Sequence, residues 1–233
     1  MVDLLSKRVN IAIDGPAGAG KSTIAKIISK TLGIIYLDTG AMYRAVALKA
    51  INEGIDTKDN VKLLSIIENI DVKISYTDNN QRIFLDGEEV TDKIRTPEIS
   101  TGASNVAVVP EVRIKMVEVQ REIASTESVV MDGRDIGTYV IPNADLKIFL
   151  TASLAERAKR RHSELLGKGG NVSIEDVKSD IEYRDKNDSS RAFAPLCKAE
   201  DAVEVDTTQM TVEEVARKII SLIKEWQSYD WAF

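Results

Sequence analysis

The sequence predicts an α/β protein with three layers, in which helices cover both faces of a five-stranded parallel sheet and a small antiparallel β insert interrupts the alternation. Most of the chain alternates short apolar runs with stretches whose apolar residues recur at helical spacing. Residues 70–95 instead alternate polar and apolar residues around turn-forming pairs, which indicates a partly solvated β-meander. The prediction of the fold class rests on these two sequence patterns.

Each element follows from its local pattern. Apolar runs predict core strands at residues 9–14, 34–37, 128–131, 145–150 and 202–206. Helical spacing, prolines in first-turn positions and three capping-box patterns predict helices. These helices are expected at residues 21–32, 40–53, 61–69, 97–107, 110–125, 154–166, 174–187 and 212–226.

Composition excludes several classes of protein. The 233 residues carry a net charge of −6, so no general basic field is available to hold a nucleic-acid backbone. The single cysteine, Cys197, and the single histidine, His162, argue against a disulfide framework, a cysteine- or histidine-rich metal site and a Ser-His-Asp triad. The beginning of the chain has no apolar signal core, and no apolar run approaches about 20 residues. We therefore expect a cytoplasmic monomer without nucleic-acid or membrane partners.

The first strand leads into a phosphate-binding pattern. Gly15, Gly20, Lys21 and Ser22 match the Walker A motif between a predicted strand and a predicted helix. The glycines let successive N–H groups converge on a phosphate, the lysine reaches the β- and γ-phosphates, and the serine hydroxyl can ligate Mg²⁺. The motif places the sheet in the P-loop NTPase fold and predicts a bound nucleoside triphosphate, but it leaves the acceptor open.

The stretch after the second strand, YLDTGAMYRA, contains residues that can form a second anion-binding site. Asp38 or Thr39 can cap the following helix, and Arg44 lies about one turn into it. The alternative is that Arg44 is an ordinary arginine on the surface of the helix. Because ligands of open α/β sheets bind beyond the carboxyl ends of the strands, we expect this helix start to face the same crevice as the phosphate loop.

The third strand ends in MDGRDIGT. Asp132 stands where a Walker B carboxylate holds Mg²⁺ or its waters, with an ordinary acidic turn as the alternative. A phosphate site has no use for a further carboxylate, so Arg134 and Asp135 require a different explanation. Together they can read a pyrimidine, since a carboxylate accepts from an exocyclic amine and an arginine donates to a ring carbonyl.

Residues 153–173 have a local charge of +3 in an otherwise acidic chain and contain three glycines that can act as hinges. A lid that brings arginines over a transferring phosphate explains this charge, and a solvated helix face is the alternative. We expect His162 to face solvent rather than act as a base. In the next helix, Arg184 and Asp188 share a face.

Five segments together resemble the bacterial cytidylate kinases, a branch of the nucleoside monophosphate kinases. They are IDGPAGAGKST, YLDTGAMYRA, IRTPEIS with ASNVA, MDGRDIGTYVIPNADLKIFLTAS and EYRDKNDSSRAFAPL, which run from residue 11 to about 206. The resemblance implies transfer of the γ-phosphate of ATP to CMP or dCMP, with Mg²⁺. It also implies a core at 1–62, 108–150 and 173–233, a monophosphate-binding insert at 63–107 and a lid at 151–172.

The resemblance also assigns residues. ATP-binding residues would be Gly15, Pro16, Ala17, Gly18, Ala19, Gly20, Lys21, Ser22 and Thr23, with Mg²⁺ on Ser22 and, through water, on Asp132. CMP-binding residues would be Thr39 (commonly serine in the family), Arg44, Ser104, Arg113, Arg134, Asp135, Arg184, Asp188 and Arg191. Ser104, Arg113 and Asp135 would read the base, Arg184 and Asp188 the ribose, and Arg44 and Arg134 the phosphate. The catalytic residues would be Lys21, Arg134, Arg157 and Arg161.

Two other functions remain as alternatives. A kinase of another small molecule, of the shikimate or gluconate type, would share the phosphate loop and the lid but not the pyrimidine-reading set. A regulatory NTPase would need a base-reading motif such as N-K-x-D, which the sequence lacks. The family pattern gives no role to Trp226, Tyr229, Trp231 and Phe233 near the end of the chain.

Overall fold

The computed structural model describes residues 8–78 and 80–230, apart from the side chains of residues 226–230. Its main sheet contains five parallel strands in the order β2-β6-β1-β7-β8, as the sequence predicts. The strands are β1 (Asn10–Asp14), β2 (Ile35–Asp38), β6 (Val129–Asp132), β7 (Leu146–Thr151) and β8 (Val203–Asp206). The order reverses around β1, which creates a ligand-binding crevice at the carboxyl ends of these strands.

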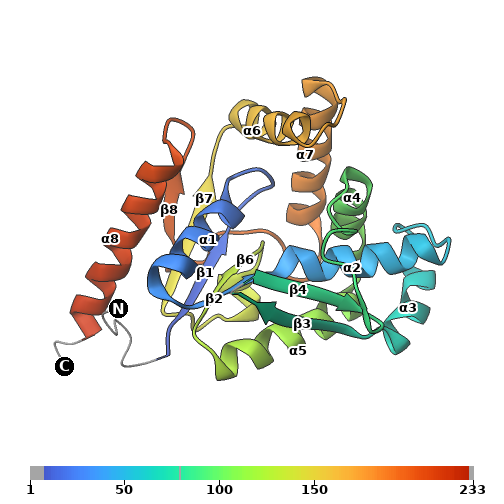
Figure 1. The fold of residues 1–233 in the computed structure, drawn as a ribbon, viewed down its shortest axis with the longest axis horizontal. Coiled ribbons are helices and arrows are strands. Elements are labelled where there is room, and N and C mark those ends of the chain that lie inside the picture. The colour runs from blue at the N-terminus through green and yellow to red at the C-terminus, as the bar shows by residue number, and fades with distance from the viewer. Residues whose placement is uncertain (1–7, 79, 231–233) are drawn as a thin grey trace.

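The helices surround this sheet and extend beyond it (Figure 1). They are α1 (Lys21–Leu32), α2 (Thr39–Asn52), α3 (Asn60–Asn69), α4 (Pro97–Val106), α5 (Pro110–Thr126), α6 (Leu154–Gly167), α7 (Ile174–Ser190) and α8 (Val212–Asp230). The capping patterns that predicted three of them are present. Thr211 and Glu214 form the reciprocal box, in which the Glu214 N–H donates to the Thr211 hydroxyl over 3.3 Å and the Thr211 N–H donates to the Glu214 carboxylate over 2.8 Å.

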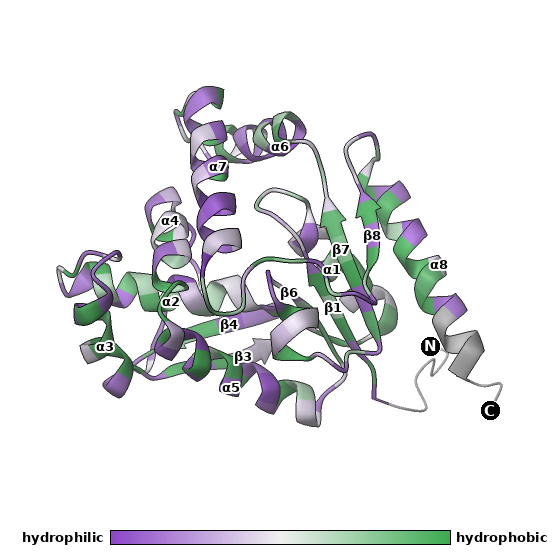
Figure 2. Cartoon of the chain, turned by 180° about the vertical axis from the view of Figure 1, so that it is seen from behind, coloured by the Kyte–Doolittle hydropathy of each residue, from purple (hydrophilic) through white to green (hydrophobic). Residues whose placement is uncertain are grey.

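Successive side chains of the central strands point to opposite faces of the sheet and form two apolar layers. Ile11 and Ile13 of β1 face α1 and α8, whereas Ala12 between them packs with residues of α5 on the opposite face. All three side chains are fully buried. The sheet is therefore apolar on both faces, and Figure 2 shows its strands mostly green while α7 is mostly purple. Polar chemistry is confined to the strand ends.

The predicted meander is a separate antiparallel sheet of β3 (Val72–Thr77), β4 (Asn80–Leu85) and β5 (Glu88–Glu89). Asp86 and Gly87 both have positive φ, 51° and 87°, which is the geometry of a two-residue type I′ turn. The sheet packs on α2, where Ile83 and Leu85 join a core cluster built from α2, α3, α4 and α5. Asn79, in the first predicted turn, lies outside the described residues.

The insert is joined to the main sheet by Gln81 of β4. Its side-chain amide accepts from the Asp38 N–H over 2.7 Å and donates to the Asp38 carbonyl over 3.2 Å. Asp38 is the last residue of β2, so this contact fixes the insert beside the point where the second predicted anion site begins.

α6 and α7 form a helical hairpin above the carboxyl edge of the sheet, and α7 also packs against α4 (Figure 1). Within the described residues, no helix has the length and apolar character required to cross a membrane. The side chains of Trp226 and Tyr229, and all of Trp231 and Phe233, lie outside the described part of the chain.

Gly15 should be far less tolerant of substitution than another glycine with positive φ. Its φ is +145°, and an added Cβ would lie 2.0 Å from the backbone oxygen of Leu150. Gly54 has a φ of +68° and nothing within 4 Å of the added atom, which makes it the matched control. Urea denaturation should show a loss of about 1 kcal/mol for Gly54→Ala and several kcal/mol for Gly15→Ala. Equal losses would contradict the close approach of β7 to the loop.

Candidate active site

A cavity of about 730 Å³ lies at the carboxyl ends of β1, β2 and β6. It extends from the loop between β1 and α1 to α4 and α7, and it joins residues that are up to 198 positions apart, between Ala17 and Val215. Most of the sequence-predicted site residues line it. They are Ala17, Gly18, Ala19, Gly20, Lys21, Ser22, Thr23, Thr39, Arg44, Ser104, Arg113, Asp132, Arg134, Asp135, Arg161, Arg184, Asp188 and Arg191. Gly15, Pro16 and Arg157 do not line it.

The phosphate loop ends at Lys21, the first residue of α1. Its ammonium donates to the Pro16 carbonyl over 2.7 Å across the loop. Burial, together with the positive charge of Arg134, lowers the pKa of Lys21 to about 7. A bound polyphosphate would reverse this effect, because its negative charge stabilises the ammonium form.

Asp132 at the end of β6 organises the metal side of the cavity. Its carboxylate accepts hydrogen bonds of 2.8 Å from the hydroxyls of Ser22 and Tyr36. Its pKa is raised by burial and by the neighbouring charge of Asp38, which stands beside it in the parallel register. Such crowding of carboxylates favours a nearby cation.

The donor set fits Mg²⁺. Ser22 and Asp132 present adjacent hard oxygen atoms, and Mg²⁺ commonly takes one or two protein ligands and completes its octahedron with water and substrate phosphate. The described residues contain no cluster of three or more metal-ligating side chains, so a larger protein cage is not present among them.

Asp14, the last residue of β1, holds the segment that follows β6. Both carboxylate oxygens accept backbone N–H groups over 2.8 Å, from Ile136 and Gly137 in the π-helical turn η1 (Ile136–Val140). Burial raises the pKa of Asp14 to about 7, even though these two hydrogen bonds lower it. The carboxylate thereby fixes the turn that follows Arg134 and Asp135.

Asp188 is the meeting point of the acceptor side. It accepts from Arg134 over 2.7 Å and from the Ser104 hydroxyl over 2.9 Å, and it lies 4.0 Å from Arg191. Burial alone would raise the pKa of Asp188, but the charges of Arg134, Arg191 and Arg184 hold it below its usual value. Residues predicted from three separate segments thus form one charged cluster.

Asp135 forms the centre of a second cluster deeper in the cavity. Arg113, only 1% exposed, makes an ion pair with it, and Arg191 lies 3.4 Å away. The Arg113 guanidinium also lies 5.4 Å from the ring centroid of Tyr43, in cation–π contact. A carboxylate, a guanidinium and an aromatic ring are therefore available to a planar ligand.

Of the two residues predicted to cap α2, Asp38 and Thr39, only Asp38 does so. Asp38 caps the helix by accepting from the Ala41 N–H over 3.0 Å, while the Thr39 hydroxyl donates to the Asp132 carbonyl over 2.8 Å. Arg44 is not a free surface residue, because it pairs with Asp38 over 2.8 Å and is mostly buried. Arg44, Arg113 and Arg184 each bury an Nε that has no hydrogen-bond partner among the described residues, which leaves donors for a ligand.

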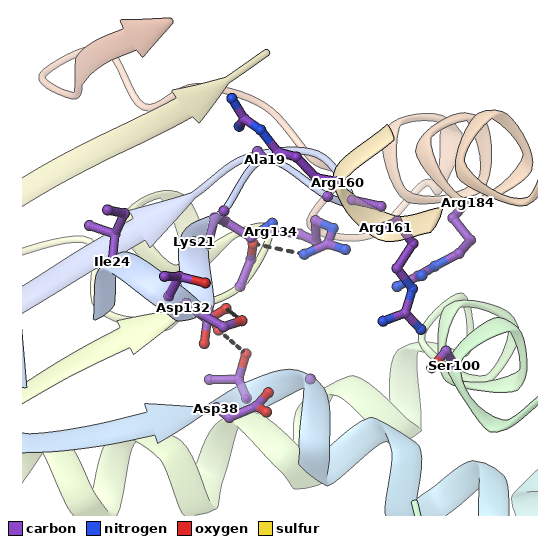
Figure 3. Close-up of a pocket in the computed structure, with 18 of the residues that line it drawn as sticks. Ala19, Lys21, Ile24, Asp38, Ser100, Asp132, Arg134, Arg160, Arg161 and Arg184 are labelled. Carbon is purple, nitrogen blue, oxygen red and sulfur yellow. Dashed lines mark hydrogen bonds between the residues drawn. The ribbon is translucent and has the colours of Figure 1, made fainter. Parts of the chain in front are cut away.

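The three arginines of the predicted lid, Arg157, Arg160 and Arg161, have different positions. Arg161 and Arg184 reach from α6 and α7 into the space above Ser100, facing Arg134 across the cavity (Figure 3). Arg160 lines the other end, where it donates to the side-chain and backbone oxygens of Thr207 over 2.9 and 2.7 Å. Arg157 lies behind the phosphate loop, where it donates to the Ala17 carbonyl over 2.8 Å.

His162 differs from the sequence expectation. It is half-buried, and its Nε2 lies 3.0 Å from the Val172 carbonyl, so the ring closes the loop between α6 and α7 rather than facing solvent freely. The charge pattern of its helix could not show this, because the contact depends on where the chain returns. His162 does not line the cavity.

Comparison with known proteins agrees with this geometry. The family model described as cytidylate kinase matches residues 11–225. The chain belongs to the cytidylate kinase family. It is 53% identical to the cytidylate kinase of Caldicellulosiruptor bescii over 93% of this chain and 96% of that protein. It is 55% identical to the cytidylate kinase of Clostridioides difficile over 91% of this chain and 97% of that protein. Membership makes the chain an ATP-dependent kinase.

The fold is also shared outside the family. A gluconokinase from Sinorhizobium meliloti 1021 superimposes with a TM-score of 0.52 at 15% identity, covering 97% of this chain and 98% of that chain. At this identity the likeness concerns the P-loop kinase fold alone.

Several residues that form the site of this cytidylate kinase family member were not predicted from the sequence. Arg95 lines the cavity beside Asp38, whose pKa it helps to lower, and Tyr43 lies under Arg113. Asp14 is hidden because its partners are backbone N–H groups 122 and 123 positions away. The wall beyond the phosphate loop comprises Thr207, Met210, Thr211, Val212 and Val215. Its position after the carboxyl end of the fifth predicted strand was the available signal.

Nucleotide binding to this kinase should take up protons near pH 8. Lys21, with a pKa of about 7, is largely neutral there and becomes charged when phosphate approaches, so affinity should fall as pH rises above 7. ADP is already fully ionised at about pH 8, because its last phosphate pKa is near 6. Calorimetry of ADP binding in two buffers of different ionisation enthalpy measures the uptake. Lys21→Arg, whose side chain stays charged, should abolish it; equal heats in both buffers for the unaltered protein would contradict the lowered pKa.

Proposed function

We propose that this protein transfers the γ-phosphate of ATP to CMP or dCMP, giving ADP and CDP or dCDP. The observation that carries the proposal is the joining, in one cavity, of a phosphate loop to a charged cluster suited to a pyrimidine nucleotide. Phosphoryl transfer needs two phosphates held in line, neutralisation of their charge and exclusion of water. The cavity offers means for each of these.

The donor would occupy the loop side. The loop N–H groups and the N-terminus of α1 would hold the β-phosphate, and Lys21 would reach the β- and γ-oxygens. Ser22, with Asp132 acting through water, would hold Mg²⁺, which supplies neutralisation of phosphate charge. Thr207, Met210 and the start of α8 would enclose the base of ATP, since they form the wall beyond the loop.

The acceptor would occupy the side of α4 and α7. Arg44 and Arg134 would bind its phosphate, and Arg184 with Asp188 would bind its ribose. Arg191 would contact the same nucleotide. Asp135, Arg113 and Ser104 would read the cytosine through its exocyclic amine and ring carbonyl. Because the acceptor phosphate is largely ionised at neutral pH, the reaction needs no general base, and the cavity provides none from His162.

The alternatives are less well supported. A gluconate- or shikimate-type acceptor has no use for the Asp135–Arg113 pair, and the similar proteins at 53% and 55% identity are named cytidylate kinases. A regulatory NTPase has no use for a second cluster of arginines facing the phosphate loop.

We also propose the domain roles predicted above, with an insert at 63–107 that binds the monophosphate and a lid at 151–172 that closes over the transfer. One chain supplies both halves of the cavity, which supports a monomer. The exposed free thiol of Cys197 suits the reducing cytoplasm.

An acceptor panel tests the function. ADP release is measured with ATP and Mg²⁺ in the presence of CMP, dCMP, UMP, AMP, GMP or shikimate. CMP or dCMP should give the largest kcat/KM, because cytosine offers an amine to Asp135 and a carbonyl to Arg113 from a single ring. Uracil lacks the amine, adenine lacks the carbonyl, and guanine carries both groups on a larger, two-ring base. ADP release without any acceptor at the same rate would favour an NTPase, and preference for AMP or shikimate would refute the cytosine assignment.

Substitution of the ribose contacts tests the division of the cavity. Arg184→Met and Asp188→Ala should lower kcat/KM for CMP by about 100-fold. The first change removes a proposed ribose donor, and the second leaves Arg134 without its buried partner. The KM for ATP should change by no more than about threefold, because the loop side is intact. Lys178→Met is the matched control, since it removes an exposed cation from the same helix. A comparable rise in the KM for ATP in the first two variants would oppose this assignment.

A further inference from the structure

A carboxylate on α7 lies outside the acceptor cluster and binds the phosphate loop instead. Asp185 follows the proposed ribose contact Arg184, yet its Oδ1 accepts from the Ala17 N–H over 3.0 Å. Its Oδ2 accepts from Arg157 over 2.5 Å. Asp185 does not line the cavity, so the site described above gives it no role.

Arg157 closes this contact into a ring. The same Nη1 that binds Asp185 donates to the Ala17 carbonyl over 2.8 Å, and its Nε donates to the Ala152 carbonyl over 3.0 Å. Both polar groups of residue Ala17 are therefore held, the N–H by α7 and the carbonyl by α6. A Cβ added to Gly18 would lie 3.1 Å from the Cβ of Arg157, so the backbone passes close to that helix.

These contacts determine what Arg157 does. Its side chain is 9% exposed and lies behind the loop, and its Nε and Nη1 bind oxygen atoms of the protein. While it keeps these bonds it does not reach a phosphate in the cavity. The Ala17 N–H is likewise directed at Asp185, which leaves the later N–H groups of the loop to bind phosphate.

We infer that Asp185, through its ion pair with Arg157, is a positioning residue that fixes the phosphate loop to the helix carrying the acceptor contacts. This inference rests on the proposed function. The donor loop precedes α1 and the acceptor contacts stand on α7, so no sheet hydrogen bond connects them directly. The Asp185 bridge connects them across 168 positions of sequence. Since an error of about 1 Å in the placement of reacting groups costs about 100-fold in rate, such a bridge acts mainly on kcat.

A double-mutant cycle tests the bridge. Asp185→Ala and Arg157→Ala should each lower kcat for CMP by about 10- to 100-fold, and the double variant should be no worse than either single variant, because both remove one interaction. Asp185→Asn keeps an acceptor for the Ala17 N–H without the charge, so it should recover part of the loss. Glu182→Gln, an exposed change on the same helix, is the control and should retain the parent rate.

A second measurement does not depend on the acceptor. ADP alone should slow amide hydrogen exchange in residues 15–23 of every variant that binds it. Slower exchange in residues 180–190 should accompany this in the parent protein and in Glu182→Gln, but not in Asp185→Ala. Thermal unfolding in parallel identifies a variant that does not fold; Asp185→Asn then takes the place of Asp185→Ala in both measurements.

The outcomes separate the two proposals. Losses that multiply in the double variant, or exchange in α7 that responds to ADP without Asp185, would overturn the positioning role. If no acceptor increases ADP release in the parent protein, the proposed function fails, and the exchange comparison still decides whether Asp185 links the loop to α7.

Discussion

The arrangement of this molecule depends on three carboxylates at the ends of three adjacent parallel strands. Asp14, Asp132 and Asp38 end β1, β6 and β2, and each is less than 10% exposed. Buried negative charges at such spacing are stable only when donors and cations surround them. Lys21, Arg44 and the hydroxyls of Ser22 and Tyr36 supply these partners, as do two backbone N–H groups of η1. The sheet register therefore assembles an electrostatically balanced edge. Hydrogen bonds of Gln81 join this edge to the insert, and the ion pair of Arg134 with Asp188 joins the loop after β6 to α7.

The acceptor half follows the same principle with fewer backbone constraints. Asp135 and Asp188 each bind arginines from distant elements, so every one of these side chains is oriented by another that also faces the cavity. Such mutual orientation leaves little freedom to lose when a ligand enters, which favours both affinity and correct placement. It also means that substitution of one partner leaves the other buried without compensation, so effects within the cluster will not be additive.

The sequence predicted best what the backbone determines locally. The Walker A glycines, the capping pair of Thr211 and Glu214 and the turn at Asp86-Gly87 are specified by nearby residues, and the family resemblance located Arg113 and Ser104. What it missed depends on tertiary position. Asp14 acts on N–H groups brought by η1, whose i→i+5 hydrogen bonds no periodicity indicated. Arg157 looked like its neighbours on a basic helix, and only the path of the phosphate loop places it behind Ala17 instead of in the cavity.

Gln81 has a consequence for the edge of the main sheet. β2 is the outermost strand of the main sheet on its side, and strands in this position expose N–H and C=O groups to which any extended chain can add. The amide of Gln81 occupies both such groups of Asp38, the residue nearest the reactive edge. The insert thereby shields the end of this strand from pairing with another molecule, which protects solubility at a place where charged side chains are committed to chemistry.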